Sequence, residues 1–148
     1  MNYLCLAAGK GTRFGRLGLY LQKCMYPVGL TPFLEFSLRN LRCSKYLDIE
    51  KDRLVLVVGH HGEQLRQYFG ESYEGLPISY LEQADPLGTG HALHLAAQIL
   101  KPVDAVIAWL ADAYVTTSLF EALSSHTEPN VQTVGSGSEG EKDDLKVT

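Results

Sequence analysis

The sequence predicts a three-layer α/β fold, with a mostly parallel β-sheet covered by helices on both faces. Short apolar runs that stop at a glycine alternate along the chain with segments whose apolar residues recur at helical spacing. Such alternation of strands and helices indicates parallel strands joined by right-handed crossovers. The 148 residues, 45% of them apolar and 20% charged, suit one globular domain with a single core.

The first predicted element is a short buried strand that runs into a long loop. Residues 3–8 form an apolar run that is too short for a helix. Residues 9–29 hold five of the fourteen glycines and no sustained helical period, which predicts a functional loop with at most one short turn. Thr31 and Pro32 favour a helix start, as N-cap and first helical residue. The apolar face of that helix consists of Leu34, Leu38 and Leu41.

The clearest strand lies in the middle of the chain. Residues 54–58 are wholly apolar, mostly β-branched and followed by Gly59, which predicts a buried parallel strand. Residues 62–69 then predict a helix that Gly70 closes. The apolar residues of this helix are Leu65, Tyr68 and Phe69. Residues 77–81 predict a further strand.

The last third of the chain continues the alternation. Residues 88–90 open a helix that Pro102 ends, and residues 103–110 predict a fourth strand. The apolar stripe of this helix is expected to be Leu93, Ala96, Ala97 and Leu100. A short helix at residues 119–123 and a weak strand at residues 131–134 complete the pattern.

We therefore expect one domain at residues 1–134, followed by a polar segment at residues 135–148. This segment is small, polar and acidic, and it cannot bury enough apolar area to offset its ordering entropy. We expect it to be a mobile loop or tail.

Charge and composition exclude several classes of protein. Thirteen basic against seventeen acidic residues give a net charge of -4, so nucleic acid is not expected as a partner. No apolar stretch approaches the roughly 18 residues of a membrane span, and no basic region precedes an apolar one at the N-terminus. The three cysteines lack a C-x-x-C pair and predict free thiols. We expect a cytoplasmic protein without a membrane partner; a homo-oligomer remains open.

The loop after the first predicted strand has the composition of a phosphate-binding loop. Gly9 and Gly11 let the backbone approach a phosphate and turn N–H groups toward it, while Lys10 and Arg13 supply positive charge. The loop fits neither the dinucleotide fingerprint, because Phe14 replaces its third glycine, nor the P-loop, because Gly11 follows Lys10. The alternative is a tight turn without a ligand.

Together with a second segment, this loop resembles the signature of the sugar-1-phosphate nucleotidyltransferases. The signature is G-x-G-T-R-[LMF], a spacer, a lysine and a proline-containing stretch that opens a helix, and residues 9–14 and 23–32 match it. The lysine of the signature is Lys23, and Gln22 replaces the proline that usually precedes it. The family has a Rossmann-like sheet, and its domain continues beyond the length of this chain. The chain is therefore expected to be truncated, without the part that supplies sugar contacts and a second acidic metal ligand.

A block at residues 83–92 is similar to the nucleobase segment of the N-acetylglucosamine-1-phosphate uridylyltransferases. There a glutamine and a glycine backbone read the pyrimidine, and G-T-G-H-A opens a helix; the matching residues are Gln83 and Gly88. A glutamine amide donates and accepts at once, which suits an imide edge. The alternative is a surface glutamine before an ordinary helix start.

A third block ends the predicted strand at residues 103–110 with a carboxylate. Ligands of open α/β sheets bind beyond the carboxyl ends of strands, so Asp112 is placed to hold Mg²⁺ against phosphates. The family has Gly-Asp here, whereas this chain has Ala111 before Asp112. The alternative for Asp112 is a helix or turn cap.

The resemblance implies transfer of a nucleoside monophosphate from a nucleoside triphosphate, preferably a pyrimidine, to a sugar 1-phosphate, with release of pyrophosphate. Arg13 and Lys23 would be catalytic, and Asp112 would hold the Mg²⁺ cofactor. Nucleotide-binding residues would be Leu6, Ala7, Ala8, Gly9, Gly11, Thr12, Gln83, Gly88 and Thr89. The alternative is a non-catalytic nucleotide-binding or regulatory module that lacks the sugar-binding half. The paired histidines, His60 with His61 and His91 with His94, are not expected to bind metal, because no cysteine or acidic residue is placed to complete a site.

Overall fold

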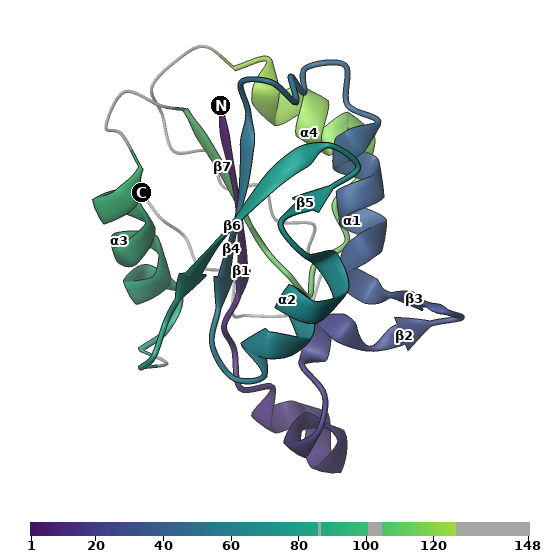
Figure 1. Cartoon of the computed structure of the whole chain (residues 1–148), viewed down its shortest axis with the longest axis vertical. Coiled ribbons are helices and arrows are strands. Elements are labelled where there is room, and N and C mark those ends of the chain that lie inside the picture. Colours follow the sequence, from purple (N-terminus) through teal and green to yellow (C-terminus); the bar gives the residue numbers. More distant parts are fainter. Residues whose placement is uncertain (86, 101–104, 127–148) are drawn as a thin grey trace, which may run out of the picture.

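The protein is built around a five-stranded sheet with the order β5-β6-β4-β1-β7 (Figure 1). The computed structural model describes residues 1–85, 87–100 and 105–126. The strands are β1 (Asn2–Ala7), β4 (Arg53–Val58), β5 (Ser72–Tyr73), β6 (Leu76–Glu82) and β7 (Val106–Leu110). β1 pairs in parallel with β4 and β7, and β4 pairs in parallel with β6, whereas β5 is antiparallel to β6. The predicted mostly parallel sheet is confirmed.

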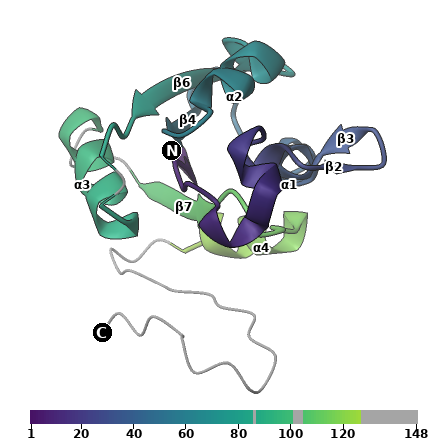
Figure 2. The same ribbon diagram turned by 90° about the horizontal axis from the view of Figure 1, so that it is seen from below.

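Helices cover both faces of this sheet (Figures 1 and 2). α1 (Phe33–Arg42), α2 (Gly62–Phe69) and α4 (Thr117–Ser124) pack on one face, and α3 (Thr89–Ile99) packs on the other. The larger core lies under the three helices and includes the expected Leu34, Leu38 and Leu41. The smaller core joins α3 to β1 and β4 through Leu4, Val55, Val57, Ala92 and Ala96. The sheet is thus the middle layer of three, as predicted.

The wholly apolar run of β4 is explained by its burial on both faces of the sheet. Leu54 to Val58 are all buried, because their alternate side chains enter the two cores in turn.

Gly70 ends α2 with a φ of 63°, a left-handed conformation that glycine adopts without strain.

The predicted helix start at Thr31 and Pro32 is wrong. These residues form the short strand β3 (Thr31–Pro32), which pairs antiparallel with β2 (Pro27–Val28), and α1 begins at Phe33. Gly29, with a φ of 66°, helps to turn the chain back so that Val28 pairs with Thr31. Pro32 is extended, with a ψ of 141°, and no side chain caps the start of α1. A local turn therefore overrides the capping preference of threonine.

The predicted apolar stripe of α3 is only partly correct. Ala96 is buried, but Leu93 and Ala97 are exposed, and Ala92 takes their place against the sheet. The small alanine side chains pack against β1 and β4, while the larger Leu93 stays at the surface.

The long loop at residues 9–29 contains two 3-10 segments, η1 (Thr12–Leu19) and η2 (Lys23–Met25). The predicted strand at residues 131–134, the polar segment at residues 135–148 and Pro102 lie outside the described residues. Within the part of the chain that the structure describes, no helix is both long and apolar enough to cross a membrane.

Candidate functional site

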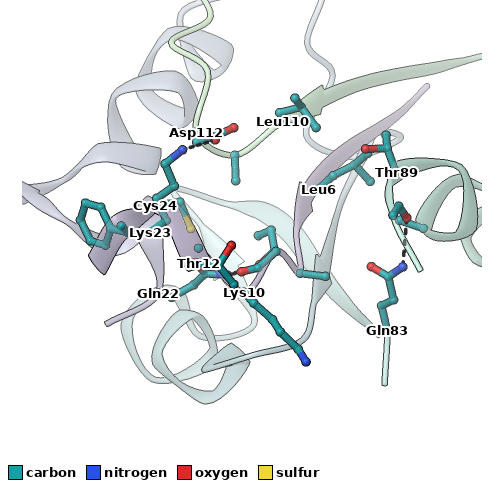
Figure 3. A pocket seen from close by; sticks show the side chains of 18 of the residues that line it. Leu6, Lys10, Thr12, Gln22, Lys23, Cys24, Gln83, Thr89, Leu110 and Asp112 are labelled. Atoms are coloured by element: carbon teal, nitrogen blue, oxygen red, sulfur yellow. Dashed lines mark hydrogen bonds and ion pairs between the residues drawn. The ribbon is translucent and has the colours of Figure 1, made fainter. Parts of the chain in front are cut away.

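A pocket of about 690 Å³ opens at the carboxyl ends of β1 and β7. The chain places β4 and β6 on one side of β1 and then returns to place β7 on the other. The carboxyl ends on either side of such a reversal diverge, which creates a crevice where open α/β sheets bind ligands. The start of α3 and the loop after β1 form further walls of the pocket (Figure 3).

All the residues proposed from the sequence line this one pocket. They come from the end of β1, its following loop, η2, the segment before α3 and the turn after β7. The set is Leu6, Ala7, Ala8, Gly9, Gly11, Thr12, Arg13, Lys23, Gln83, Gly88, Thr89 and Asp112. The fold therefore brings together segments that the sequence separates by about a hundred residues, although their roles remain predictions.

The glycine loop has the backbone shape that its glycines permit. Gly11 has a φ of 60°, which places it in the left-handed region at the start of η1. Beneath the loop, a Cβ on Gly59 would lie 3.0 Å from the carbonyl oxygen of Ala8 and 3.1 Å from that of Gln83. Glycine at position 59 therefore lets the chain after β1 and the chain after β6 lie close to the end of β4.

Gln22 is a site residue that the sequence reasoning missed. Its side chain is buried, and its Nε2 donates to the carbonyl oxygens of Ala7 and Gly9, the latter at 3.3 Å. Its backbone N–H donates to Oε1 of Gln64 at 2.8 Å, and Nε2 of Gln64 donates to Tyr20 O at 2.8 Å. Gln22 therefore ties the glycine loop to the segment that carries Lys23. The only signal in the sequence was its occurrence where the family has proline.

Lys23 and Asp112 meet across the pocket. Nζ of Lys23 lies 2.7 Å from Oδ2 of Asp112, and both side chains are more than 40% exposed. Lys23 begins η2, and Asp112 follows β7, so two separate elements position the pair (Figure 3). An ion pair this exposed adds little to stability, and both groups stay accessible to a ligand.

Gln83 lies at the opposite end of the pocket from this ion pair (Figure 3). Its side chain is buried, and its Nε2 contacts Gly88 O at 3.1 Å and Nδ1 of His91 at 3.0 Å. The alternative of an ordinary surface glutamine is therefore wrong. Gly88 precedes α3 with a φ of 92°, a backbone conformation that favours glycine, and the helix begins at the next residue.

Comparison with known proteins identifies the family. Residues 3–143 match the model of the MobA-like NTP transferase domain. The chain belongs to this family. The sequence-based resemblance to nucleotidyltransferases that act on sugar phosphates is confirmed.

Individual relatives of this NTP transferase domain include a bifunctional protein and a sugar-1-phosphate uridylyltransferase. The bifunctional protein GlmU of Chromobacterium violaceum is 38% identical over 96 residues, which are 65% of this chain and 18% of GlmU. The UTP-glucose-1-phosphate uridylyltransferase AglF of Haloferax volcanii is 37% identical over 93 residues, which are 63% of this chain and 36% of AglF. The chain thus spans well under half of these relatives.

A solved structure supports the fold. The crystal structure of UDP-glucose pyrophosphorylase complexed with UDP-glucose superposes with a TM-score of 0.66 and 22% identity, over 84% of this chain and 51% of the other. The predicted Rossmann-like arrangement is confirmed.

The donor set of the NTP transferase domain fits Mg²⁺ only in the company of a phosphate. Asp112 offers a hard carboxylate on the pocket wall, and Mg²⁺ is commonly held by one or two carboxylates together with substrate phosphates and waters. Among residues 1–85, 87–100 and 105–126, no three His, Cys, Asp or Glu side chains cluster as a metal site. The expected ligand role of Asp112 is thus chemically compatible with this pocket.

Cys24 lines the pocket as a buried free thiol. Burial raises the pKa of its thiol to about 12, so the thiol is protonated at neutral pH.

Proposed function

We propose that this pocket binds a nucleoside triphosphate, preferably a pyrimidine, and transfers its nucleoside monophosphate to a sugar 1-phosphate with release of pyrophosphate. The observation that carries the proposal is that one pocket brings together the glycine loop, the basic residues Arg13 and Lys23, a carboxylate and the buried amide of Gln83. Nucleotidyl transfer needs positioning and charge neutralisation more than covalent chemistry, and this set supplies both.

In the proposed reaction, a phosphate oxygen of the sugar phosphate attacks the α-phosphorus. The new bond joins that oxygen to the α-phosphorus, and the bond to the β-phosphate oxygen breaks. Lys23 would hold the α-phosphate and the incoming phosphate, since its ammonium is exposed to the pocket. Arg13 would neutralise the charge that develops on the leaving pyrophosphate.

The remaining lining residues would bind the nucleoside. Backbone N–H groups of the loop at Gly9, Gly11 and Thr12 suit phosphate oxygens, and Leu6, Ala7 and Ala8 line the wall beside them. Gln83, Gly88 and Thr89 would read the base. Asp112 would hold Mg²⁺, which supplies neutralisation of phosphate charge when bound.

A second candidate is a nucleotide-binding module without catalysis. One observation favours it: Asp112 is the only acidic residue among the described residues that line the pocket. Such a module would bind the triphosphate but would not transfer its nucleoside monophosphate to a sugar 1-phosphate.

A pyrophosphate-release assay separates the two candidates. The chain is incubated with each of UTP, dTTP, CTP, GTP and ATP against a panel of hexose and N-acetylhexosamine 1-phosphates, with Mg²⁺ or with chelator. Release that needs both a triphosphate and a sugar phosphate, and that is lost in Lys23→Ala, supports transfer. Triphosphate binding without release under any pairing supports the module and contradicts transfer by this chain.

A further inference from the structure

We propose that His91 is a positioning residue that sets the base preference of the pocket by fixing the amide of Gln83. The inference rests on the proposed function and specifies its selectivity. The pocket would favour bases whose edge carries a ring N–H beside a carbonyl, as in uracil and thymine, over cytosine. Guanine shares this edge, and adenine lacks it.

Gly88 determines which way the Gln83 amide points. The nitrogen Nε2 lies 3.1 Å from Gly88 O, and a carbonyl oxygen can only accept a hydrogen bond. The amide nitrogen must therefore face Gly88, and the amide oxygen Oε1 must face the other way.

His91 uses the second hydrogen of the same nitrogen. Its Nδ1 lies 3.0 Å from Nε2 of Gln83, and a nitrogen that meets an N–H donor must accept. Nδ1 of His91 is therefore the acceptor in this contact, which places the ring proton on Nε2. Turning the amide over would bring two acceptors, Oε1 and Nδ1, against each other, so His91 locks the orientation that Gly88 selects.

The locked amide presents an acceptor to the pocket. Gln83 is only 5% exposed and lines the pocket, and no hydrogen bond reaches its Oε1 from the residues that the structure describes. Figure 3 shows Oε1 directed into the pocket, away from the bonded nitrogen. Beside it α3 begins at Thr89, where first-turn N–H groups have no partner within the helix.

The acceptor Oε1 of Gln83 can bind an N–H of the base, and the neighbouring backbone N–H groups of α3 can bind a carbonyl of the base. Uracil and thymine present N3–H beside O4 in this order, whereas cytosine presents an acceptor at N3 beside an amino group. Cytosine would thus meet the fixed Oε1 with its own ring acceptor. Without His91, one hydrogen bond to Gly88 O would hold the amide instead of two, so turning Gln83 to suit cytosine would cost less.

The test measures the ratio of dissociation constants for CTP and UTP by calorimetric titration. His91→Leu removes the acceptor, His91→Asn keeps an acceptor at the δ position, and His94→Leu is the matched control, since His94 is exposed on the same helix and contacts Gln98. We expect His91→Leu to lower the CTP to UTP ratio about fivefold, while His91→Asn and His94→Leu retain it. A merely structural role would weaken both ligands equally.

Two results would overturn the proposal. One is an unchanged ratio in a folded His91→Leu protein that still binds UTP. The other is a ¹⁵N NMR spectrum of the parent protein in which the neutral His91 ring carries its proton on Nδ1; this readout needs no variant. Failure of the parent to bind any triphosphate would instead contradict the proposed function itself, and the inference with it.

Discussion

Nζ of Lys23 lies 2.7 Å from Oδ2 of Asp112, and this contact joins two residues that are 89 positions apart in the chain. Each partner has a second proposed task, since Lys23 would bind phosphate and Asp112 would bind Mg²⁺. In this structure each residue neutralises the charge of the other. A triphosphate with Mg²⁺ would replace this single contact with several, so the pair would separate when the nucleotide binds.

Asp112→Asn should remove the Mg²⁺-dependent part of nucleotide affinity and abolish any turnover. With chelator present, affinity should change little or rise, because a negative charge beside the phosphates is lost. The measurement is a UTP titration of parent and variant, each with Mg²⁺ and with chelator. A variant that keeps the full Mg²⁺ effect would remove Asp112 from the site.

Arg13→Ala and Lys23→Ala should each weaken triphosphate binding by tenfold or more while the fold stays intact. Both side chains are exposed on the pocket loops, and a charge-assisted hydrogen bond contributes on the order of 1.5 to 3 kcal/mol. Arg16→Ala is the matched control, because Arg16 is exposed on the same η1 segment but does not line the pocket. Equal binding by all three variants and the parent would show that the phosphates lie elsewhere.

Gln22→Ala should weaken nucleotide binding and lower the free energy of unfolding by about 1 to 3 kcal/mol. The reason is that the carbonyls of Ala7 and Gly9 lose the donor that holds the glycine loop. Urea unfolding and UTP titration measure the two effects. Gln98→Ala, at an exposed position on α3, controls for loss of a glutamine. A stable Gln22→Ala protein with parental affinity would mean that the loop keeps its shape unaided.

Glu35 should make the fold sensitive to acid. Burial raises its pKa, but hydrogen bonds from Tyr68 and Arg39 and the charge of Arg39 outweigh this, so the pKa lies below its ordinary value of 4.5. Ionised Glu35 therefore stabilises the fold above about pH 4.5, and this stabilisation is lost as the pH falls through the lowered pKa.

The check is Glu35→Gln, compared with the exposed control Glu50→Gln by urea unfolding at pH 7 and at pH 3.5. Glu35→Gln should be clearly less stable than the parent at pH 7, and the difference should shrink at pH 3.5. A difference that grows on acidification would contradict the lowered pKa.

The parts of this structure that the sequence predicts are those with strong local signals. Residues 54–58 are wholly apolar, and a strand buried on both faces of a parallel sheet fits them best. The position of Asp112 just after β7 follows from the rule that ligands bind beyond the carboxyl ends of such strands. Parallel strands bring their carboxyl ends to one edge of a sheet, which is why the separated motifs meet in one pocket.

The parts that could not be predicted depend on contacts distant in sequence or on competing local preferences. Gln22 bonds to the end of β1 and to Gln64, and no spacing rule reveals such partners. Thr31 is a good helix cap in isolation, but pairing with Val28 places it in a hairpin. The buried face of α3 depends on how closely Ala92 approaches the sheet, which helical periodicity alone does not fix.

Calorimetric titration of the chain with Mg²⁺ and UTP, dTTP, CTP or ATP is the most direct test that this pocket is a nucleoside triphosphate site. We expect saturable binding that is tightest for UTP or dTTP and is weakened in Lys23→Ala. The absence of binding heat and of a thermal shift with every triphosphate at millimolar concentration would contradict it.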